Sequence, residues 1–360
     1  MRLRVDKLKQ DVSMLFKACK HVIETLTLVN ALQLLGIGHL FEEEVDIRLR
    51  HIHDCEFNSS SLYEEALRFR LLREHGLWVS PDVFNKFKDE RGSFRKEITN
   101  EPKGVLGLYN ATFLLIHGEP ELEEAMSFAR YHLELMRDSF KSPLAEQVKR
   151  ALHIPLPRTY RRLETMHYLS EYTQEEGHSP ILLELAKLEF TLLQYVHLKE
   201  LKSISRWDRN ADSLLPEYLK MFYNLILTTF KDFEDRLGLD KRNQVMYVKK
   251  EVSSYLLPLT TWSIIYLTIT LYTVECYMYD HKVDIEVALA RIDSFMEDEW
   301  KTINQARFEG PGLILAKFLK RVINYATSSS LFYGRNKEGF TFGGQLREIV
   351  DTLFVKSVPL

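Results

Sequence analysis

The sequence predicts an all-α protein made of two helical domains. Apolar residues recur with the 3.6-residue period of an amphipathic helix along almost the whole chain, whereas the alternating pattern of half-buried strands is scarce. Only 15 glycines and 11 prolines occur in 360 residues, so few tight hairpins are expected. A chain of this length with 45% apolar residues has enough material for two hydrophobic cores.

The N-terminal segment is typical of a helix rather than of a targeting signal. Apolar residues recur at every third or fourth position among Arg2, Arg4, Lys7 and Lys9. The segment lacks the apolar core of about 7–15 residues that marks a signal peptide. Asp6 brings an early negative charge, which is unusual in a transit peptide. We therefore expect a cytoplasmic protein.

Glycine and proline mark the helix boundaries in order along the chain. Gly76 suits a helix C-terminus, and the following Ser80-Pro81 combines an N-cap serine with a proline at the first helical position. Gly118-Glu119-Pro120 and Gly310-Pro311-Gly312 are further breaks between helices.

The clearest helix is predicted at 181–201. Ser179-Pro180 repeats the start signal, and Leu185, Leu188 and Leu192 follow the helical period with charged residues between them. Upstream, Pro155-x-Pro157 and a polar loop at 171–178 form the best boundary between domains. The predicted domains are therefore 1–170 and 171–360.

One uncharged stretch, 252–274, is long enough to cross a bilayer. Eight of its 23 residues are Ser or Thr, Pro258 interrupts it, and Glu275 follows in place of a basic flank. These features favour a buried helix pair or an irregular core segment over a membrane span.

Charge and cysteine content exclude further classes of protein. The net charge is −3, from 48 basic and 51 acidic residues, which offers no electrostatic case for a nucleic acid or an anionic membrane as partner. Cys19, Cys55 and Cys276 are far apart and form no CxxC motif. They indicate a reducing compartment without a disulfide framework.

Candidate metal ligands are few. His51, His53, Asp54 and Cys55 have the composition of a ligand cluster, but helical residues two positions apart point about 200° away from each other. A solvated helix end is the favoured interpretation. The acidic run at 42–46 is typical of a solvated face or of the first turn of a helix.

Other charged groups leave two interpretations open. Asp208 and Asp212 could chelate Mg²⁺ together from one helix face, or could cap a helix. The cluster of Arg158, Arg161 and Arg162 could bind an anion, although a solvated helix face is favoured. The chain contains no GxGxxG, GxxxxGK[ST] or GxSxG motif. Aromatic residues make up 12% of the chain; most should be core, but an aromatic-lined helical barrel would also suit carbocation chemistry.

Strings along nearly the whole chain match one known family. Those in the N-terminal half are Leu67–Arg73, Val79–Lys88, Gly107–Ala111, Ile116–Gly118, Ile154–Arg158 and Arg162–Glu164. Those in the C-terminal half are Leu182–Leu188, Leu192–Gln194, Lys199–Leu201, Ser205–Trp207, Val274–Met278, Glu299–Asn304, Tyr333 and Glu338–Thr341. Together they resemble the plant terpene synthases, and they are most similar to the cytosolic, sesquiterpene-forming branch of that family.

The resemblance implies a terpene synthase N-terminal helical domain over 1–170 and a metal-binding-type α-domain over 171–360. It implies a class I cyclase, a lyase in which three Mg²⁺ ions bind and ionise a prenyl diphosphate, farnesyl diphosphate in this branch. An aromatic pocket then guides the carbocation to a sesquiterpene. In the family the metals are held by Asp-Asp-x-x-Asp and by (Asn/Asp)-Asp-x-x-(Ser/Thr)-x-x-x-Glu on facing helices.

The sequence departs from this pattern in its metal motifs. It contains no Asp-Asp and no Asn-Asp dipeptide, so both metal motifs are absent, as is the Asp-x-Asp-Asp motif of protonation-initiated cyclases. The departures have the form of deletions: Ser205-Arg-Trp207 runs directly into Asp208, and a second gap precedes Val274–Met278. Skipped exons, a mis-predicted gene model or a decayed copy would each produce them. We therefore expect an α-domain with helices missing and with impaired catalysis.

Few site residues can be carried over from the family. Tyr333 matches a pocket tyrosine, Glu338 stands where the family has Asp, and Phe340 stands where it has Tyr. Trp262, beside the second gap, matches a helix tryptophan that contacts substrate. No metal ligand can be named. The expected partner of an active chain is a prenyl diphosphate, with no nucleic acid and no membrane, in a monomer or weak dimer. The alternative is a non-catalytic helical protein: a decayed paralogue, a splice product or an interaction module.

Overall fold

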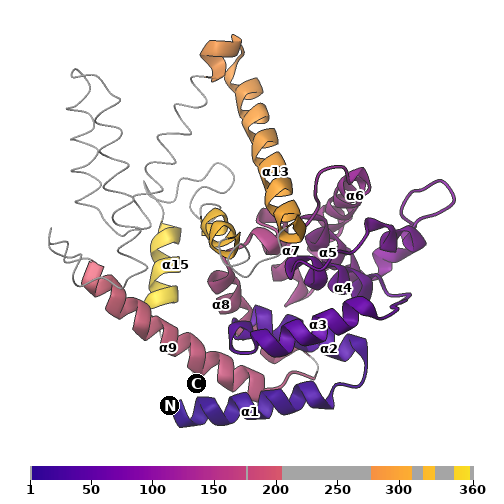
Figure 1. The fold of residues 1–360 in the computed structure, drawn as a ribbon. Coiled ribbons are helices and arrows are strands. Elements are labelled where there is room, and N and C mark those ends of the chain that lie inside the picture. Colours follow the sequence, from indigo (N-terminus) through magenta and orange to yellow (C-terminus); the bar gives the residue numbers. More distant parts are fainter. Residues whose placement is uncertain (1, 176, 205–276, 310–318, 329–343, 357–360) are drawn as a thin grey trace, which may run out of the picture. The chain divides into compact units, whose positions relative to one another are not determined.

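A computed structural model describes residues 2–175, 177–204, 277–309, 319–328 and 344–356 of the chain. These residues are helical almost throughout (Figure 1) and contain no strand; an isolated antiparallel bridge joins Lys88 and Phe94. The prediction of an all-α fold is therefore confirmed. No helix within these ranges is long and apolar enough to span a bilayer, and the uncharged stretch 252–274 lies outside them.

The helices alternate with short loops. The α-helices up to residue 171 are α1 (Arg2–Ala18), α2 (Val22–Leu34), α3 (Glu42–Asp54), α4 (Leu62–Glu74), α5 (Pro102–Thr112), α6 (Pro120–Met136), α7 (Leu144–His153) and α8 (Arg161–Glu171). Short 3₁₀ helices join them: η1 (Gly38–Leu40), η2 (Pro81–Phe87), η3 (Lys96–Asn100), η4 (Arg137–Ser139), η5 (Leu156–Arg158) and η6 (Tyr172–Gln174). Further along lie α9 (Pro180–Ile204), α13 (Ile285–Glu309), a helical stretch at 319–328, and α15 (Gly344–Phe354).

The chain forms two compact units. The first comprises residues 1–191 and 294–360, and the second comprises residues 192–293. Helices α9 and α13 each contribute residues to both units. The division at residue 170 that the sequence suggests stays a prediction.

Helix α4 is the central element of the first unit. Its residues are buried on every side from Glu65 to Arg73, which is typical of a helix enclosed by other helices. The N–H groups of its first turn are satisfied from two sides. Ser61 caps the helix by accepting a hydrogen bond from the Glu64 N–H, and the Glu101 carboxylate accepts bonds from the Leu62 and Tyr63 N–H groups.

Helix α1 shows how the apolar period becomes packing. Val5, Leu8, Val12 and Phe16 recur at three- and four-residue intervals, and all four are buried. The opposite face carries the basic residues seen in the sequence, and Arg4 makes a bidentate ion pair with Glu184 of α9. This pair is exposed, so it contributes little to stability.

Several predicted helix boundaries are confirmed. Helix α9 begins at Pro180, α6 begins at Pro120 after Gly118 with its φ of +83°, and the acidic run at 42–46 forms the first turn of α3. The break at 310–312 lies outside the described residues.

The segment after Ser80-Pro81 forms a 3₁₀ helix, η2, rather than an α-helix. Ser80 accepts a hydrogen bond from the Asp82 N–H, as expected of a cap. Phe84 and Phe87 are both buried, and their three-residue spacing matches the three-residue turn of a 3₁₀ helix.

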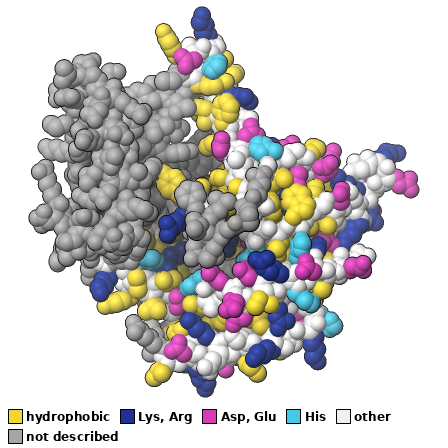
Figure 2. Space-filling view, in the orientation of Figure 1, with side chains coloured by type: hydrophobic (Ala, Val, Ile, Leu, Met, Phe, Trp, Pro, Cys, Tyr) yellow, Lys and Arg dark blue, Asp and Glu magenta, His cyan; other side chains and the backbone are white. Residues whose placement is uncertain are grey.

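Acidic and basic side chains alternate over the described part of the surface in Figure 2, where neither sign forms a large patch. This mixed surface agrees with the nearly balanced composition of 48 basic and 51 acidic residues.

Candidate functional site

The residues predicted for the catalytic site are outside the described part of the chain. This holds for Trp262, Tyr333, Glu338 and Phe340 and also for the Asp208–Asp212 pair. Within the described ranges, no three or more His, Cys, Asp or Glu side chains come close enough to hold a metal ion. The features that can be built from side chains are a contact surface of α13 and a cavity, both in the first compact unit.

The His51–Cys55 cluster forms the end of helix α3. His53 contacts the Asp54 carboxylate at 3.0 Å through Nδ1 and the Trp78 carbonyl at 3.1 Å through Nε2. His51 instead lies beside the Cys55 sulfur, with 3.7 Å between Nδ1 and Sγ. The two imidazoles therefore have separate partners, and Cys55 is a free thiol.

The arginine cluster at 158–162 is not a solvated helix face, so that interpretation is wrong for two of its members. Arg158 is buried and makes a bidentate ion pair with Glu297, with N–O distances of 2.6 and 2.7 Å. Arg162 lies over the Phe190 ring, and burial lowers the pKa of its guanidinium. Arg161 is exposed. The cluster is split because Arg158 belongs to η5, while the other two open α8.

One stripe of helix α13 packs against the N-terminal helices. It consists of Glu297, Trp300, Lys301, Asn304, Arg307 and Phe308, which recur at helical spacing, and we name it the α13 contact surface. The Asn304 side-chain amide donates to the carbonyls of Phe113 and Leu115, both at 3.0 Å. Asn304 is 2% exposed, so it satisfies two carbonyls that follow the end of α5.

Aromatic rings surround Arg158 at one end of this surface. Its guanidinium lies 4.8 Å from the centre of the Phe113 ring and 5.0 Å from that of Trp300. Such stacking suits a planar arginine that is already paired with a carboxylate. The two rings therefore cover the Arg158 side of the ion pair, while the Glu297 side chain stays 49% exposed.

At the other end of the α13 contact surface, Phe308 lies beside a fully buried arginine of α4. Arg73 of α4 makes a bidentate ion pair with Glu119, at 2.5 and 2.8 Å, and also donates to the Val79 and Leu114 carbonyls. The rings of Phe69, Trp78 and Phe308 surround its guanidinium. This paired, solvent-free arrangement is the one in which removing one partner is most costly.

A close backbone approach fixes the register of the α13 contact surface. Gly76, which follows α4, has a φ of +74°, and a Cβ atom placed on it would lie 2.8 Å from the Arg307 carbonyl oxygen. Arg307 in turn donates to the Glu74 carbonyl at 2.8 Å. Burial lowers the pKa of Arg307 to about 10, and the nearby Glu74 carboxylate opposes that shift. Glycine is required here for both conformation and space.

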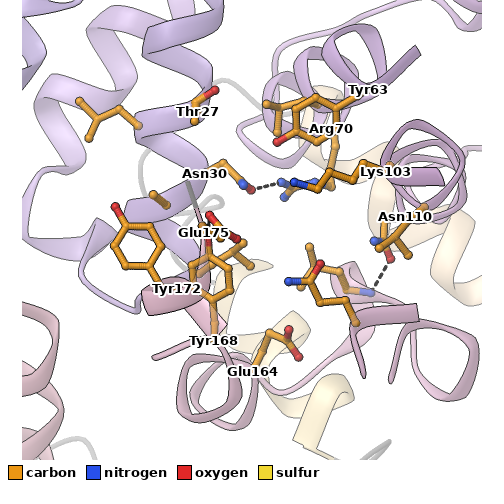
Figure 3. A pocket seen from close by; sticks show the side chains of 18 of the residues that line it. Thr27, Asn30, Tyr63, Arg70, Lys103, Asn110, Glu164, Tyr168, Tyr172 and Glu175 are labelled. Carbon is orange, nitrogen blue, oxygen red and sulfur yellow. Dashed lines mark hydrogen bonds between the residues drawn. The ribbon is translucent and has the colours of Figure 1, made fainter. Parts of the chain in front are cut away.

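A cavity of about 590 Å³ opens among the helices of the same unit. Its apolar lining comes from α1, α2, α4, α5, α7, η5 and α9 and includes Leu15, Leu28, Ala31, Leu34, Ala66, Leu67, Leu106, Ile154, Leu156 and Leu182. Its polar lining includes Asn30, Tyr63, Arg70, Lys103, Asn110, Glu164, Tyr168, Tyr172 and Glu175, which Figure 3 shows grouped around one space.

The two arginines of the cavity wall are paired with carboxylates. Arg150 pairs with Glu164 at 2.9 Å and with Glu171 at 2.5 Å. Although burial opposes it, these hydrogen bonds raise the pKa of Arg150 above its ordinary value. Arg70 pairs with Glu74 at 3.3 Å and donates to the Asn30 side-chain oxygen (Figure 3).

Other polar groups in the cavity keep free hydrogen-bonding capacity. Asn110 accepts a bond from the Leu156 N–H through Oδ1 (Figure 3), while its Nδ2 has no acceptor among the described residues. The Tyr63 hydroxyl also has no hydrogen-bond partner among the described residues, and burial raises its pKa. Glu175 accepts a bond from the Tyr168 hydroxyl at 3.0 Å, and burial raises the pKa of its carboxyl group. No motif in the sequence predicts this cavity.

The fold of the described part of the chain is that of an all-α protein. Comparison with known proteins identifies its family. The terpene synthase N-terminal domain matches residues 1–152, and the metal-binding domain of the same family matches residues 194–263. The chain is 34% identical to tau-cadinol synthase of Zea mays, across 100% of this chain and 93% of that protein. The chain belongs to the terpene synthase family.

A second relative, unlike tau-cadinol synthase, is similar in length to this chain. The chain is 35% identical to a Zea mays protein named inactive beta selinene synthase, and the match covers 98% of both chains. By contrast, the match to tau-cadinol synthase extends over 513 residues. Since this chain has 360 residues, about 150 positions of that longer alignment have no counterpart here.

The fold has a counterpart among solved structures. Isoprene synthase of grey poplar (Populus x canescens), in complex with three Mg²⁺ ions and dimethylallyl-S-thiolodiphosphate, matches with a TM-score of 0.73. The sequence identity is 22%, and the match covers 99% of this chain and 97% of that structure. At this identity the match supports the fold alone.

Proposed function

We propose that the chain derives from Mg²⁺-dependent sesquiterpene synthases that act on farnesyl diphosphate, and that it is impaired in this reaction. One observation carries the proposal: a chain that aligns along its whole length with terpene synthases contains no Asp-Asp and no Asn-Asp dipeptide. Both metal motifs of the family, as they are usually written, need such a pair.

The chemistry explains why this loss matters. Ionisation of a prenyl diphosphate leaves a multiply charged diphosphate, which metal ions neutralise. Mg²⁺ prefers hard oxygen ligands such as paired carboxylates. The described residues do not fit such a metal, since they contain no suitable cluster, and only residues 194–204 of the matched metal-binding segment are described. We therefore derive no catalytic step from this chain.

The relatives support both the substrate class and the impairment. The relatives named tau-cadinol synthase and alpha-copaene synthase form fifteen-carbon terpenes, which suggests farnesyl diphosphate as the ancestral substrate. The relative that shares this chain's length is named inactive. About 150 alignment positions without a residue are enough to remove several helices from a helical bundle.

The alternative is a non-catalytic interaction module, and one observation favours it. At the start of α13, Ile285, Val287 and Leu289 remain about half exposed. Apolar side chains exposed together can pair with a partner protein. An intact synthase is the partner that this alternative would predict.

A product assay tests the proposal. The purified full chain is incubated with farnesyl or geranyl diphosphate, with Mg²⁺ or with EDTA, and volatile products are separated by gas chromatography with mass detection. Tau-cadinol synthase of Zea mays serves as positive control. We expect no Mg²⁺-dependent product from a chain that unfolds cooperatively on heating.

Mg²⁺-dependent terpene formation would overturn the proposed impairment. It would show that other carboxylates, with Asp208, Asp212 and Asp235 as first candidates, assemble a metal site. Alanine substitution of each aspartate would then identify the ligands, because loss of a ligand abolishes Mg²⁺-dependent turnover while the melting temperature reports on folding.

A further inference from the structure

We propose that the cavity in the first compact unit binds a neutral, mainly hydrocarbon small molecule that carries one or two oxygen atoms. The inference uses only residues between Leu15 and Leu182. It therefore does not depend on the proposed function, and it holds whether or not the chain makes a terpene.

The size of the cavity is suitable for a small molecule. Its volume of about 590 Å³ lies within the range of about 300–1,000 Å³ that is typical of ligand pockets. Leucine, isoleucine and alanine supply 12 of the 31 lining residues, and they form the apolar part of the wall against which a hydrocarbon skeleton would bind.

The charges of the wall argue against an ionic ligand. Arg70 is paired with Glu74, which also contacts Arg161 at 3.6 Å, and Arg150 is paired with both Glu164 and Glu171. Lys103 makes no ion pair with a described residue, but it is exposed, so water screens its charge. An anion would compete with carboxylates that already hold the arginines.

The free hydrogen-bonding groups indicate oxygen atoms on the ligand. The side-chain amide nitrogen of Asn110 has no acceptor in the described part of the chain, although Asn110 is only 8% exposed. The Tyr63 hydroxyl can both donate and accept. In a half-enclosed apolar space, a hydroxyl or carbonyl oxygen of the ligand would satisfy these groups at little cost.

Glu175 indicates that an organic cation is not the occupant. The Tyr168 and Tyr172 rings lie beside it with their centres 5.6 Å apart and their planes tilted by 41°, which is a geometry that could receive an ammonium group. The Glu175 carboxyl group, however, already accepts the Tyr168 hydroxyl at 3.0 Å, and burial raises its pKa, so its charged form is less favoured than that of an exposed carboxyl group. It is therefore a weak counter-charge for a cation.

Three probes with the same fifteen-carbon chain separate these possibilities: farnesol, farnesoic acid and farnesylamine. Binding of each to the full chain is measured by equilibrium dialysis at pH 7, below the solubility limit of the probe. We expect saturable binding of one farnesol per chain, with weaker binding of the acid and of the amine. Tighter binding of the acid or of the amine than of farnesol would overturn the neutral class, and no saturable farnesol binding would overturn the site.

Two variants locate the binding. Tyr63→Phe removes a hydroxyl that has no described protein partner, so folding should be unaffected while farnesol binds roughly fivefold more weakly. Ala31→Phe places a ring in the cavity and should abolish binding. Tyr131→Phe is the matched control, because Tyr131 lies on α6 outside the cavity and is exposed.

The same variants also test whether farnesol binds in the cavity at all. Farnesol affinity that is unchanged by both Tyr63→Phe and Ala31→Phe would place the binding elsewhere and contradict the proposal. If Ala31→Phe does not fold, Tyr63→Phe decides alone: an effect no larger than that of Tyr131→Phe contradicts it. Farnesyl diphosphate binding in the C-terminal half would be insensitive to all three variants.

Discussion

At the α13 contact surface, Arg158, Asn304 and Arg307 bond to partners 139, 191 and 233 positions away in the sequence. In the cavity of the same unit, Tyr63 and Asn110 keep polar atoms that bond to no described residue. The two regions contain similar types of side chain. They differ in whether the polar atoms find their hydrogen-bonding partners within the described chain.

This difference separates structural from binding roles. Where polar groups are satisfied within the protein, a substitution should appear as a change in the free energy of unfolding. Where groups remain free in a cavity, a substitution should leave stability nearly unchanged and alter ligand binding. Substitutions in both regions test this separation.

The largest effect is expected for Arg73→Met. The change removes the bidentate pair with Glu119 and leaves a buried carboxylate without its counter-charge. Loss of one partner of a buried pair costs roughly 3–5 kcal/mol. Urea unfolding followed by circular dichroism would measure the loss.

The double variant Arg73→Met with Glu119→Gln is the control for this pair. Since it removes the uncompensated charge, it should recover part of the lost stability. A single variant that lost less than about 1 kcal/mol would show that the pair is not the structural element proposed here.

An intermediate effect is expected for Asn304→Leu at the α13 contact surface. The Phe113 and Leu115 carbonyls would lose their shared donor, at a cost of roughly 1–3 kcal/mol. Hydrogen exchange of the amides at 297–308 should accelerate. Asn100→Leu is the matched control, because Asn100 is exposed and ends η3; equal effects of the two changes would contradict a specific role for Asn304.

The smallest effect concerns the cavity and depends on pH. Burial raises the folded-state pKa of Glu175 above its ordinary value of 4.5, so the folded chain holds this proton to higher pH than the unfolded chain. The stability contributed by the neutral carboxyl is present below pH 4.5 and is lost as the pH rises through the raised pKa.

Glu175→Gln cannot ionise, so it should be more stable than the parent at pH 8 and similar to it at pH 4. Thermal melts at pH 4, 6 and 8 would measure the difference. Glu90→Gln, at an exposed position, is the control. A parent chain whose advantage over the Gln variant grew with pH would contradict the assignment.

Local sequence signals predicted much of the fold. The Ser179-Pro180 start of α9, the Gly118 break before α6 and the acidic first turn of α3 all depend on neighbouring residues, and the structure confirms them. The 3₁₀ form of η2 was missed because the start signal is the same for both helix types, while the spacing of Phe84 and Phe87 decides between them.

Long-range features could not be predicted in the same way. Arg158 was interpreted as solvated because its partner, Glu297, comes from a helix 139 positions later. The cavity is lined by segments of several helices, so no single sequence window contains it. The candidate catalytic residues, from Trp262 to Phe340, lie outside the described ranges and stay predictions.

The α13 contact surface also has a consequence for how the protein is made. Arg158 leaves the ribosome 139 residues before Glu297, a delay of roughly 7–28 s at about 5–20 residues per second. During this time Arg158 and the Phe113 and Leu115 carbonyls have no α13 residue to bond with. The nascent N-terminal helices therefore leave the Arg158 guanidinium and these two carbonyl groups in contact with water until α13 has been synthesised.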